Sequence, residues 1–265
     1  MDAYPFNLIL AVATASATIF LGFLPTKSIS SAFFARETAK ALLAWVLVAF
    51  TSSPKIMHLE FVLAFLCFAS WWHFRRDRAL NGKMWLSMAS GLGISLGIMF
   101  ILTVTPRAYP PGLPPLNETL LLASIYLGSA VIGLAYTCCT LSLSEKAGVT
   151  QNILRRYTGL LLGLTIARAA VLLVTYIAPP RFYTYYPQIK RYDDGLSLPP
   201  SHTESFFTPS LPLLMLFSAV FILPFLAFFA QRATGFSSLA QPTRYLAAII
   251  VIAFLTEILV RTLVL

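Results

Sequence analysis

Long apolar runs separated by short polar connections dominate the pattern of this chain. A transmembrane helix needs about 20 mostly apolar residues, and eight runs approach or reach that length. They cover residues 6–24, 38–53, 57–75, 84–105, 119–143, 157–178, 208–231 and 245–265. Pro25, Pro106 and Pro179 each follow the end of a run, where proline stops a helix. The pattern predicts an all-α fold, a polytopic transmembrane helix bundle of about eight spans formed by residues 1–265 as a single transmembrane domain.

Three details refine this picture. The second run is short and Pro54 separates it from the third, so the two are predicted to form a tight helical hairpin. Pro224 falls inside the seventh run and predicts a kink there. The connection 179–207 is long and holds four tyrosines among prolines and balanced charges. Loops of this length are often functional, so 179–207 is either a lid or docking surface, or a plain interfacial loop.

Composition supports a bilayer environment. Hydrophobic residues make up 58% of the chain and charged residues 11%, against about 25% charged residues in ordinary soluble domains. A bilayer accepts apolar surface on every face of a helix, and helices satisfy their own backbone groups there. The net charge of +9 arises from Lys and Arg in short loops, which indicates headgroup contact rather than nucleic-acid binding. The first run lacks the basic start of a signal peptide and is expected to stay as a span.

The loop charges also predict an orientation. Twelve of the 19 Lys and Arg residues follow the first, third, fifth and seventh runs: Lys27, Arg36, Lys40, Arg75, Arg76, Arg78, Lys83, Lys146, Arg155, Arg156, Arg232 and Arg244. The other side holds Lys55, Arg107, Arg181, Lys190 and Arg191. Basic loops face the cytoplasm, so both termini and the 179–207 loop are expected outside. Trp71, Trp72 and Trp85 lie beside the inner basic residues, as interfacial tryptophans do.

Several kinds of chemistry lack their motifs. A bis-histidine haem needs two histidines at similar depth, but His58 and His73 lie at opposite ends of one run, about 22 Å apart at 1.5 Å per residue. His202 belongs to the outer loop. The sequence has no C-x-x-C, H-E-x-x-H, G-x-S-x-G or Walker motif. We therefore expect no haem, metal or other cofactor held by this chain and no catalytic residue.

Ionisable residues inside the apolar runs are the strongest functional signal. Arg168 lies near the middle of the sixth run, and Glu257 and Arg261 lie one helical turn apart in the last. A central arginine costs roughly 2.5–3.5 kcal/mol on insertion scales, so a carboxylate partner is expected. We predict that Arg168 and Glu257 meet across the bundle. The alternative pairs Glu257 with Arg261 and leaves Arg168 to backbone carbonyls or to the hydroxyls of Tyr136 and Thr137.

These charges allow three interpretations. They form an ion pair that holds helices together, or a ligand or quinone site, or they reach lipid headgroups. A transporter of a small or lipid-like solute could use Arg168 and the kink at Pro224. A purely structural membrane subunit would need the ion pair alone.

The last run resembles the terminal helix of the NrfD-like family, the membrane anchors of DMSO reductase and polysulfide reductase. That helix carries a glycine and a glutamate after an apolar stretch, then an arginine one turn on; here Thr256, Glu257 and Arg261 fill those places. The segment from His73 through Arg78 and on to Trp85-Leu86-Ser87 is similar to that family's inner-side region. The resemblance implies eight spans without haem.

Function follows from this resemblance as an expectation. It implies an anchor or quinone-interacting subunit of a respiratory-type complex, at most a quinol-binding part of an oxidoreductase. The expected quinone or ligand residues are His73, Arg78, Arg168, Glu257 and Arg261. The expected partners are the lipid bilayer, in a bacterial inner (plasma) membrane, and other protein subunits that carry iron–sulfur clusters. A bound quinone would be the only small-molecule ligand.

Overall fold

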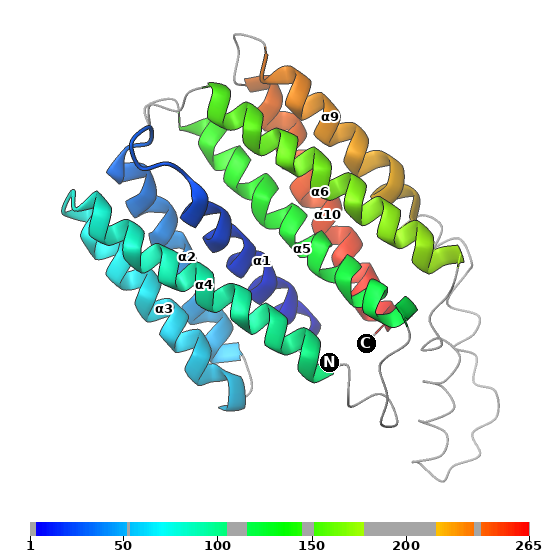
Figure 1. Ribbon diagram of the computed structural model, residues 1–265, viewed down its shortest axis with the longest axis horizontal. Coiled ribbons are helices and arrows are strands. Elements are labelled where there is room, and N and C mark those ends of the chain that lie inside the picture. The colour runs from blue at the N-terminus through cyan, green and yellow to red at the C-terminus, as the bar shows by residue number, and fades with distance from the viewer. Residues whose placement is uncertain are drawn as a thin grey trace.

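The computed structural model describes residues 4–51, 54–104, 116–144, 151–177, 216–235 and 240–264. Within these ranges the fold is all-α (Figure 1), with no strand. The helices are α1 (Tyr4–Phe23), α2 (Ser31–Thr51), α3 (Pro54–Arg75), α4 (Ala79–Val104), α5 (Leu116–Leu143), α6 (Gln151–Ile177), η4 (Ser218–Ile222), α9 (Leu223–Ala233) and α10 (Ala240–Val264). The predicted all-α fold is confirmed, the number of spans and the side on which the termini lie stay predictions, and the 179–207 loop lies outside the described residues.

Helix α1 joins two groups of helices. On one side, α2 packs on α3 and α3 on α4; on the other, α5 packs on α6 and α10, and α9 packs on α6 and α10. Helix α1 contacts α2 and α4 from the first group and α5 from the second (Figure 1). The N- and C-terminal ends of the chain lie at the same end of the bundle.

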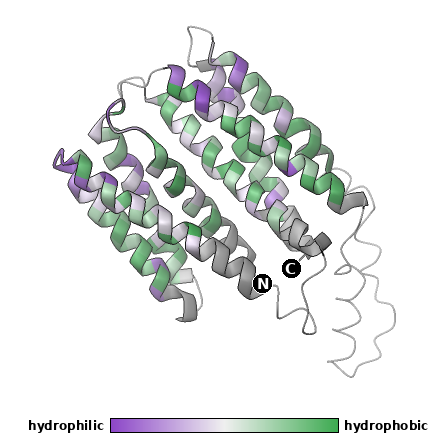
Figure 2. Cartoon of the chain, in the orientation of Figure 1, coloured by the Kyte–Doolittle hydropathy of each residue, from purple (hydrophilic) through white to green (hydrophobic). Residues whose placement is uncertain are grey.

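The bundle is apolar on the outside as well as in its core. Three helical segments of the described residues are long and apolar enough to cross a membrane: Tyr126–Leu143, Gln151–Val174 and Gln241–Ile258. Large apolar side chains point outward, including Phe50, which is 74% exposed, and Phe225, which is 62% exposed. Figure 2 shows apolar residues along the helices and polar residues gathered toward one end of the bundle. Such a surface suits lipid rather than water.

Several helices begin earlier than the apolar runs predict. Helix α2 begins at Ser31 instead of residue 38, and α6 begins at Gln151 instead of residue 157. The first two turns of both helices carry charged side chains that can lie at a membrane interface, so an apolar run marks only the hydrocarbon part of a longer helix. The Arg36 to Lys40 stretch, expected in a loop, is therefore helical.

Lys83 fixes the start of α4 against the end of α1. Its Nζ donates hydrogen bonds to the carbonyl oxygens of Gly22 and of Leu24, the latter at 2.6 Å. These carbonyls belong to the C-terminal end of α1, which attracts cations. Burial lowers the pKa of Lys83 from its usual 10.5 to about 8.

The seventh run contains a change of helix type at the predicted position. A π-helical segment, η4, runs directly into α9, which has Pro224 at its start. Proline has no N–H to donate and clashes with the preceding turn, so the hydrogen-bond register shifts here. A change of helix type thus lies directly before Pro224, while the predicted kink itself stays a prediction.

Candidate functional site

Arg168 of α6 and Glu257 of α10 form an ion pair in the bundle interior. The Nη2 group of Arg168 donates a hydrogen bond to Oε1 of Glu257. The arginine side chain is 1% exposed and the glutamate side chain 0%. The predicted contact between these two residues is confirmed. Because both charges are removed from water, the pair has to be satisfied by the protein or by a bound molecule.

Gly128 of α5 makes room for this pair. A Cβ added at Gly128 would lie 2.7 Å from Cζ of Arg168 and would overlap the carboxylate of Glu257. Only a residue without a side chain allows α5 to pass this close. The pair therefore sits at a junction of three helices, α5, α6 and α10.

Arg168 keeps two donors beyond the one that Glu257 accepts. Its Nε and Nη1 atoms are buried and have no hydrogen-bond partner among the described residues. A buried donor without a partner costs about 1–3 kcal/mol, and native interiors seldom leave one. The geometry therefore offers two fixed donor nitrogens to an acceptor that the protein itself does not supply within the described ranges.

The π-helical segment lies at the depth of Arg168. A Cβ at Gly159 of α6 would lie 3.3 Å from Nε2 of Gln231 in α9. Gly159 and Gln231 are therefore at about the same height along the bundle axis. Helices α6 and α9 pack against each other in opposite directions (Figure 1). Arg168 comes nine residues after Gly159, and Ile222 comes nine residues before Gln231. Each step is about 14 Å in the same direction along the bundle, so Arg168 and Ile222 lie at a similar height. Segments of π-helix occur often at functional sites.

The alternative partners for Arg168 have other roles. The hydroxyl of Tyr136 donates to Oε2 of Glu37 at 3.1 Å, and that of Thr137 donates to the carbonyl of Gly133. The side chain of Arg261 lies outside the described residues, although its backbone continues α10. The proposed pairing with Glu257 within the last helix stays untested.

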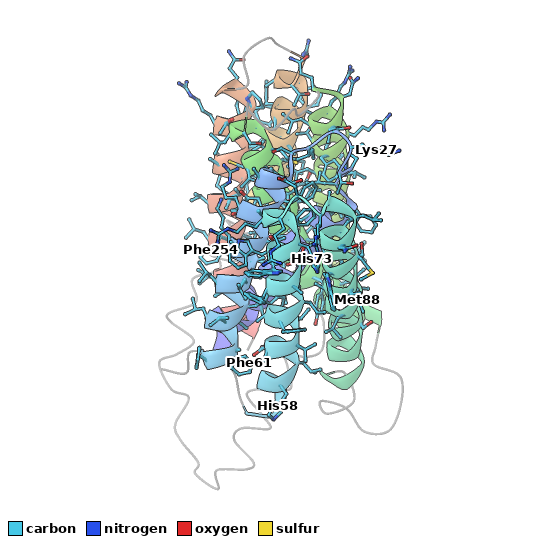
Figure 3. All side chains as sticks on the ribbon, turned by 90° about the vertical axis from the view of Figure 1, so that its left-hand side faces the viewer. Lys27, His58, Phe61, His73, Met88 and Phe254 are labelled. Carbon is cyan, nitrogen blue, oxygen red and sulfur yellow. The ribbon has the colours of Figure 1, made fainter. Side chains whose placement is uncertain are left out.

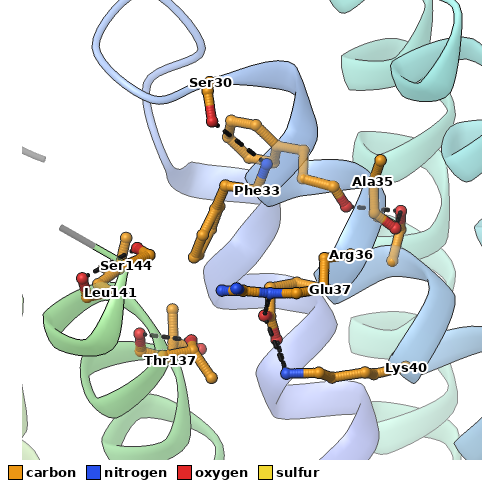
Figure 4. A network of polar contacts seen from close by, with 12 residues as sticks. Ser30, Phe33, Ala35, Arg36, Glu37, Lys40, Thr137, Leu141 and Ser144 are labelled. Atoms are coloured by element: carbon orange, nitrogen blue, oxygen red, sulfur yellow. Dashed lines mark hydrogen bonds and ion pairs between the residues drawn. The ribbon is translucent and has the colours of Figure 1, made fainter. Parts of the chain in front are cut away.

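Glu37 is a further buried acid, which the sequence reasoning missed. Its carboxylate is 0% exposed and accepts hydrogen bonds from Arg36 Nε at 2.9 Å and from Lys40 Nζ at 3.0 and 3.2 Å (Figure 4). Tyr136 of α5 adds the contact described above, so the group links α2 with α5. Arg36 and Lys40 are about half exposed.

A helical pattern could have revealed Glu37. It lies four residues after Phe33 and four before Ala41, and both of these neighbours are buried. Residues four apart share one helix face, so Glu37 lies in the middle of a buried stripe. The flanking basic residues made the segment resemble a solvated charge run.

His73 and Arg78 do not join Arg168 and Glu257. His73 lies in the last turn of α3, and its carbonyl accepts the N–H groups of Arg76 at 3.1 Å and of Arg78 at 2.9 Å. Helix α3 packs on α2 and α4, in the other group of helices. Figure 3 places His58 at the far end of the bundle, well separated from His73. The five predicted ligand residues are therefore divided between at least two places.

No metal site is formed by three or more His, Cys, Asp or Glu side chains within the ranges that the structure describes. The chain was also compared with known proteins. It matches no protein-family model, no curated protein and no solved structure. The resemblance of the last helix to the NrfD-like anchors is thus left as an expectation.

Proposed function

We propose that this chain is an eight-span subunit of a bacterial inner membrane, with both termini outside, that anchors a respiratory-type complex and binds a quinone. The basic residues of alternate loops support the orientation. The apolar outer surface supports the membrane location. The redox partner, carrying iron–sulfur clusters, comes from the resemblance of the last helix alone.

One observation carries the ligand site: Arg168 is buried with two donors that no described residue accepts. Glu257 already balances the charge of Arg168, so an added anion would leave an uncompensated charge in a low dielectric, which is costly. A neutral carbonyl acceptor meets the donors without that cost. A quinone head carries such carbonyls on a lipid-soluble molecule, and π-helical segments such as the one at this depth are frequent at functional sites.

The test separates the spare donors from the ion pair. Arg168→Lys keeps a positive charge beside Glu257 but removes the planar guanidinium with its Nε and Nη1 donors. Arg36→Lys is the matched control, because Arg36 also pairs with a glutamate. We expect purified Arg168→Lys protein to bind decylubiquinone at least about tenfold more weakly, the effect of roughly 1.4 kcal/mol. The control should bind like the wild type. Equal binding by wild type and Arg168→Lys would refute the quinone site.

Transport of a small or lipid-like solute is the second candidate function. The π-helical segment before Pro224 favours it, because interrupted membrane helices line solute sites in many transporters. Uptake of solutes into vesicles containing the purified chain alone would support transport. An anchor subunit instead co-purifies with redox partners in mild detergent, visible by mass spectrometry and by an optical spectrum of their cofactors.

A further inference from the structure

Helix α3 carries an exposed aromatic stripe that ends at an arginine. Phe61, Phe65, Phe68 and Trp72 are spaced four, three and four residues apart, and Arg76 follows four residues later. This spacing places the four aromatic residues on one face of the helix, and Arg76 comes directly after its last residue, Arg75. All four aromatic side chains face outward, with exposed fractions from 38% for Phe61 to 60% for Phe65. The face thus joins a long apolar surface to a cation.

Two arginines at the end of this stripe stack on indole rings. The guanidinium of Arg76 lies 4.1 Å from the ring centroid of Trp72, and that of Arg75 lies 5.4 Å from the centroid of Trp71. The two indoles are 6.3 Å apart. Stacking uses the flat face of a guanidinium and leaves the N–H donors at its edge free to bind an acceptor. Neither arginine forms an ion pair within the described residues.

The backbone holds this end of α3 in one shape. Asp77 has φ of 54°, the left-handed conformation that ends many helices. Its N–H bonds to the carbonyl of Phe74 at 3.1 Å, and the N–H of Arg78 bonds to that of His73 at 2.9 Å. This pair of hydrogen bonds is a Schellman motif. The stacked arginines therefore stand on an ordered helix end, beside a third exposed cation, Arg78.

The shape and charge fit one class of ligand. Arginine edges bind phosphate oxygens through paired hydrogen bonds. The stripe from Phe61 to Arg76 is about 22 Å long at 1.5 Å per residue, longer than the roughly 15 Å of one leaflet of the hydrocarbon core. A free phosphate would use only the arginines, and a lipid without a phosphate only the aromatic rings. A zwitterionic phospholipid brings a headgroup cation close to the arginines, which repel it. An anionic phospholipid uses both.

We propose that the end of α3 binds an anionic phospholipid, with its phosphate on Arg75 and Arg76 and an acyl chain along Trp72, Phe68 and Phe65. This site shares with the proposed function only the location in a membrane. It does not involve Arg168, Glu257 or a quinone.

The experiment compares two arginine pairs. Arg75→Gln/Arg76→Gln removes the stacked pair, and Arg155→Gln/Arg156→Gln removes an adjacent exposed pair on α6 for which the structure describes no aromatic stacking. Both variants lose the same charge. Retention of phosphatidylglycerol against phosphatidylcholine is measured by native mass spectrometry of the purified full chain. We expect the preference for phosphatidylglycerol to fall at least about fivefold in the first variant, because only the stacked guanidinium groups are held in place to bind the phosphate through paired hydrogen bonds. The second variant should stay near wild type.

A second comparison tests the acyl-chain part. Phe65→Ala/Phe68→Ala should weaken binding of long-chain phosphatidylglycerol and leave dihexanoyl phosphatidylglycerol unchanged, because the short chains do not reach these rings. Equal loss in both arginine pairs would overturn the site. Complete displacement of the lipid by millimolar inorganic phosphate would also overturn it, because the head group alone would then account for binding.

Discussion

The ion pair between Arg168 and Glu257 makes a quantitative prediction for stability. Replacing either residue by leucine leaves the other charge buried and unpaired, since the two side chains are 1% and 0% exposed. Removing one partner of a buried pair costs about 3–5 kcal/mol. Replacing both removes both charges, so most of that cost disappears. A remainder of about 1–2 kcal/mol is expected because leucine fills less volume than arginine and leaves a cavity.

The coupling energy follows from these values. Two single losses of about 4 kcal/mol and a double loss of about 2 kcal/mol give a coupling on the order of 6 kcal/mol, above the 0.5–3 kcal/mol usual for neighbouring residues. Water or a bound ligand at the free donors of Arg168 would screen its charge and so lower the coupling energy. We therefore expect a measured coupling of at least about 2 kcal/mol.

The assay is unfolding of the purified chain in mixed micelles, followed by circular dichroism as the denaturing detergent fraction rises. Wild type, both single variants and the double variant form the cycle. Arg155→Leu is the control, because Arg155 is exposed and should change the free energy of unfolding by less than about 0.5 kcal/mol. If the losses at Arg168 and Glu257 simply add, to within about 0.5 kcal/mol, the pair does not stabilise the bundle and the reasoning fails.

Three further predictions use other contacts. Gly128→Ala should destabilise the chain by about 1–3 kcal/mol, because the new Cβ overlaps the carboxylate of Glu257; the same unfolding assay measures it, and a loss that persists unchanged in a Glu257→Ala background would contradict this cause. Tyr136→Phe should cost about 1–3 kcal/mol by removing a donor from the buried carboxylate of Glu37, whereas Tyr157→Phe, at another tyrosine of the bundle, serves as the control. Because the pKa of Lys83 is about 8 when folded and 10.5 when exposed, the unfolded chain binds more protons between these values. The free energy of unfolding should therefore rise from pH 8 to pH 10.5, while neutral Lys83 still donates to Gly22 and Leu24; a Lys83→Met variant with the same rise would show that another group causes it.

The sequence predicts the pairing of Arg168 with Glu257 because a lone charge in lipid is costly and few acidic residues in the apolar runs could be the partner. Both residues lie in long apolar runs, and each needs an opposite charge. The same reasoning does not reach Gly128, since a glycine in an apolar helix has many possible roles. It becomes informative only when the helix that faces it is known. Here the packing of α5 on α6 and α10 assigns that role.

Glu37 shows where charge patterns mislead. A carboxylate between Arg36 and Lys40 looks like part of a solvated loop, yet the helix extends through it and turns its side chain inward. The two basic neighbours remain about half exposed and reach back to Glu37. Long basic side chains can do this because their stems lie along the apolar surface while their charged ends stay near water. The periodicity of Phe33, Glu37 and Ala41 carries more information here than the charges do.

Two of the buried acids, Glu37 on α2 and Glu257 on α10, both lie against α5, and this gives α5 a special place in the bundle. Gly128 of α5 packs against the Arg168–Glu257 pair, and Tyr136 binds Glu37 about 12 Å further along the same helix. In lipid the hydrophobic effect does not select which helices meet, so close packing and polar contacts have to do so. Within its own group α5 lies against the Arg168–Glu257 pair at Gly128, and it reaches α2 of the other group through the hydroxyl of Tyr136. A shift of α5 along its axis would therefore disturb both polar groups together.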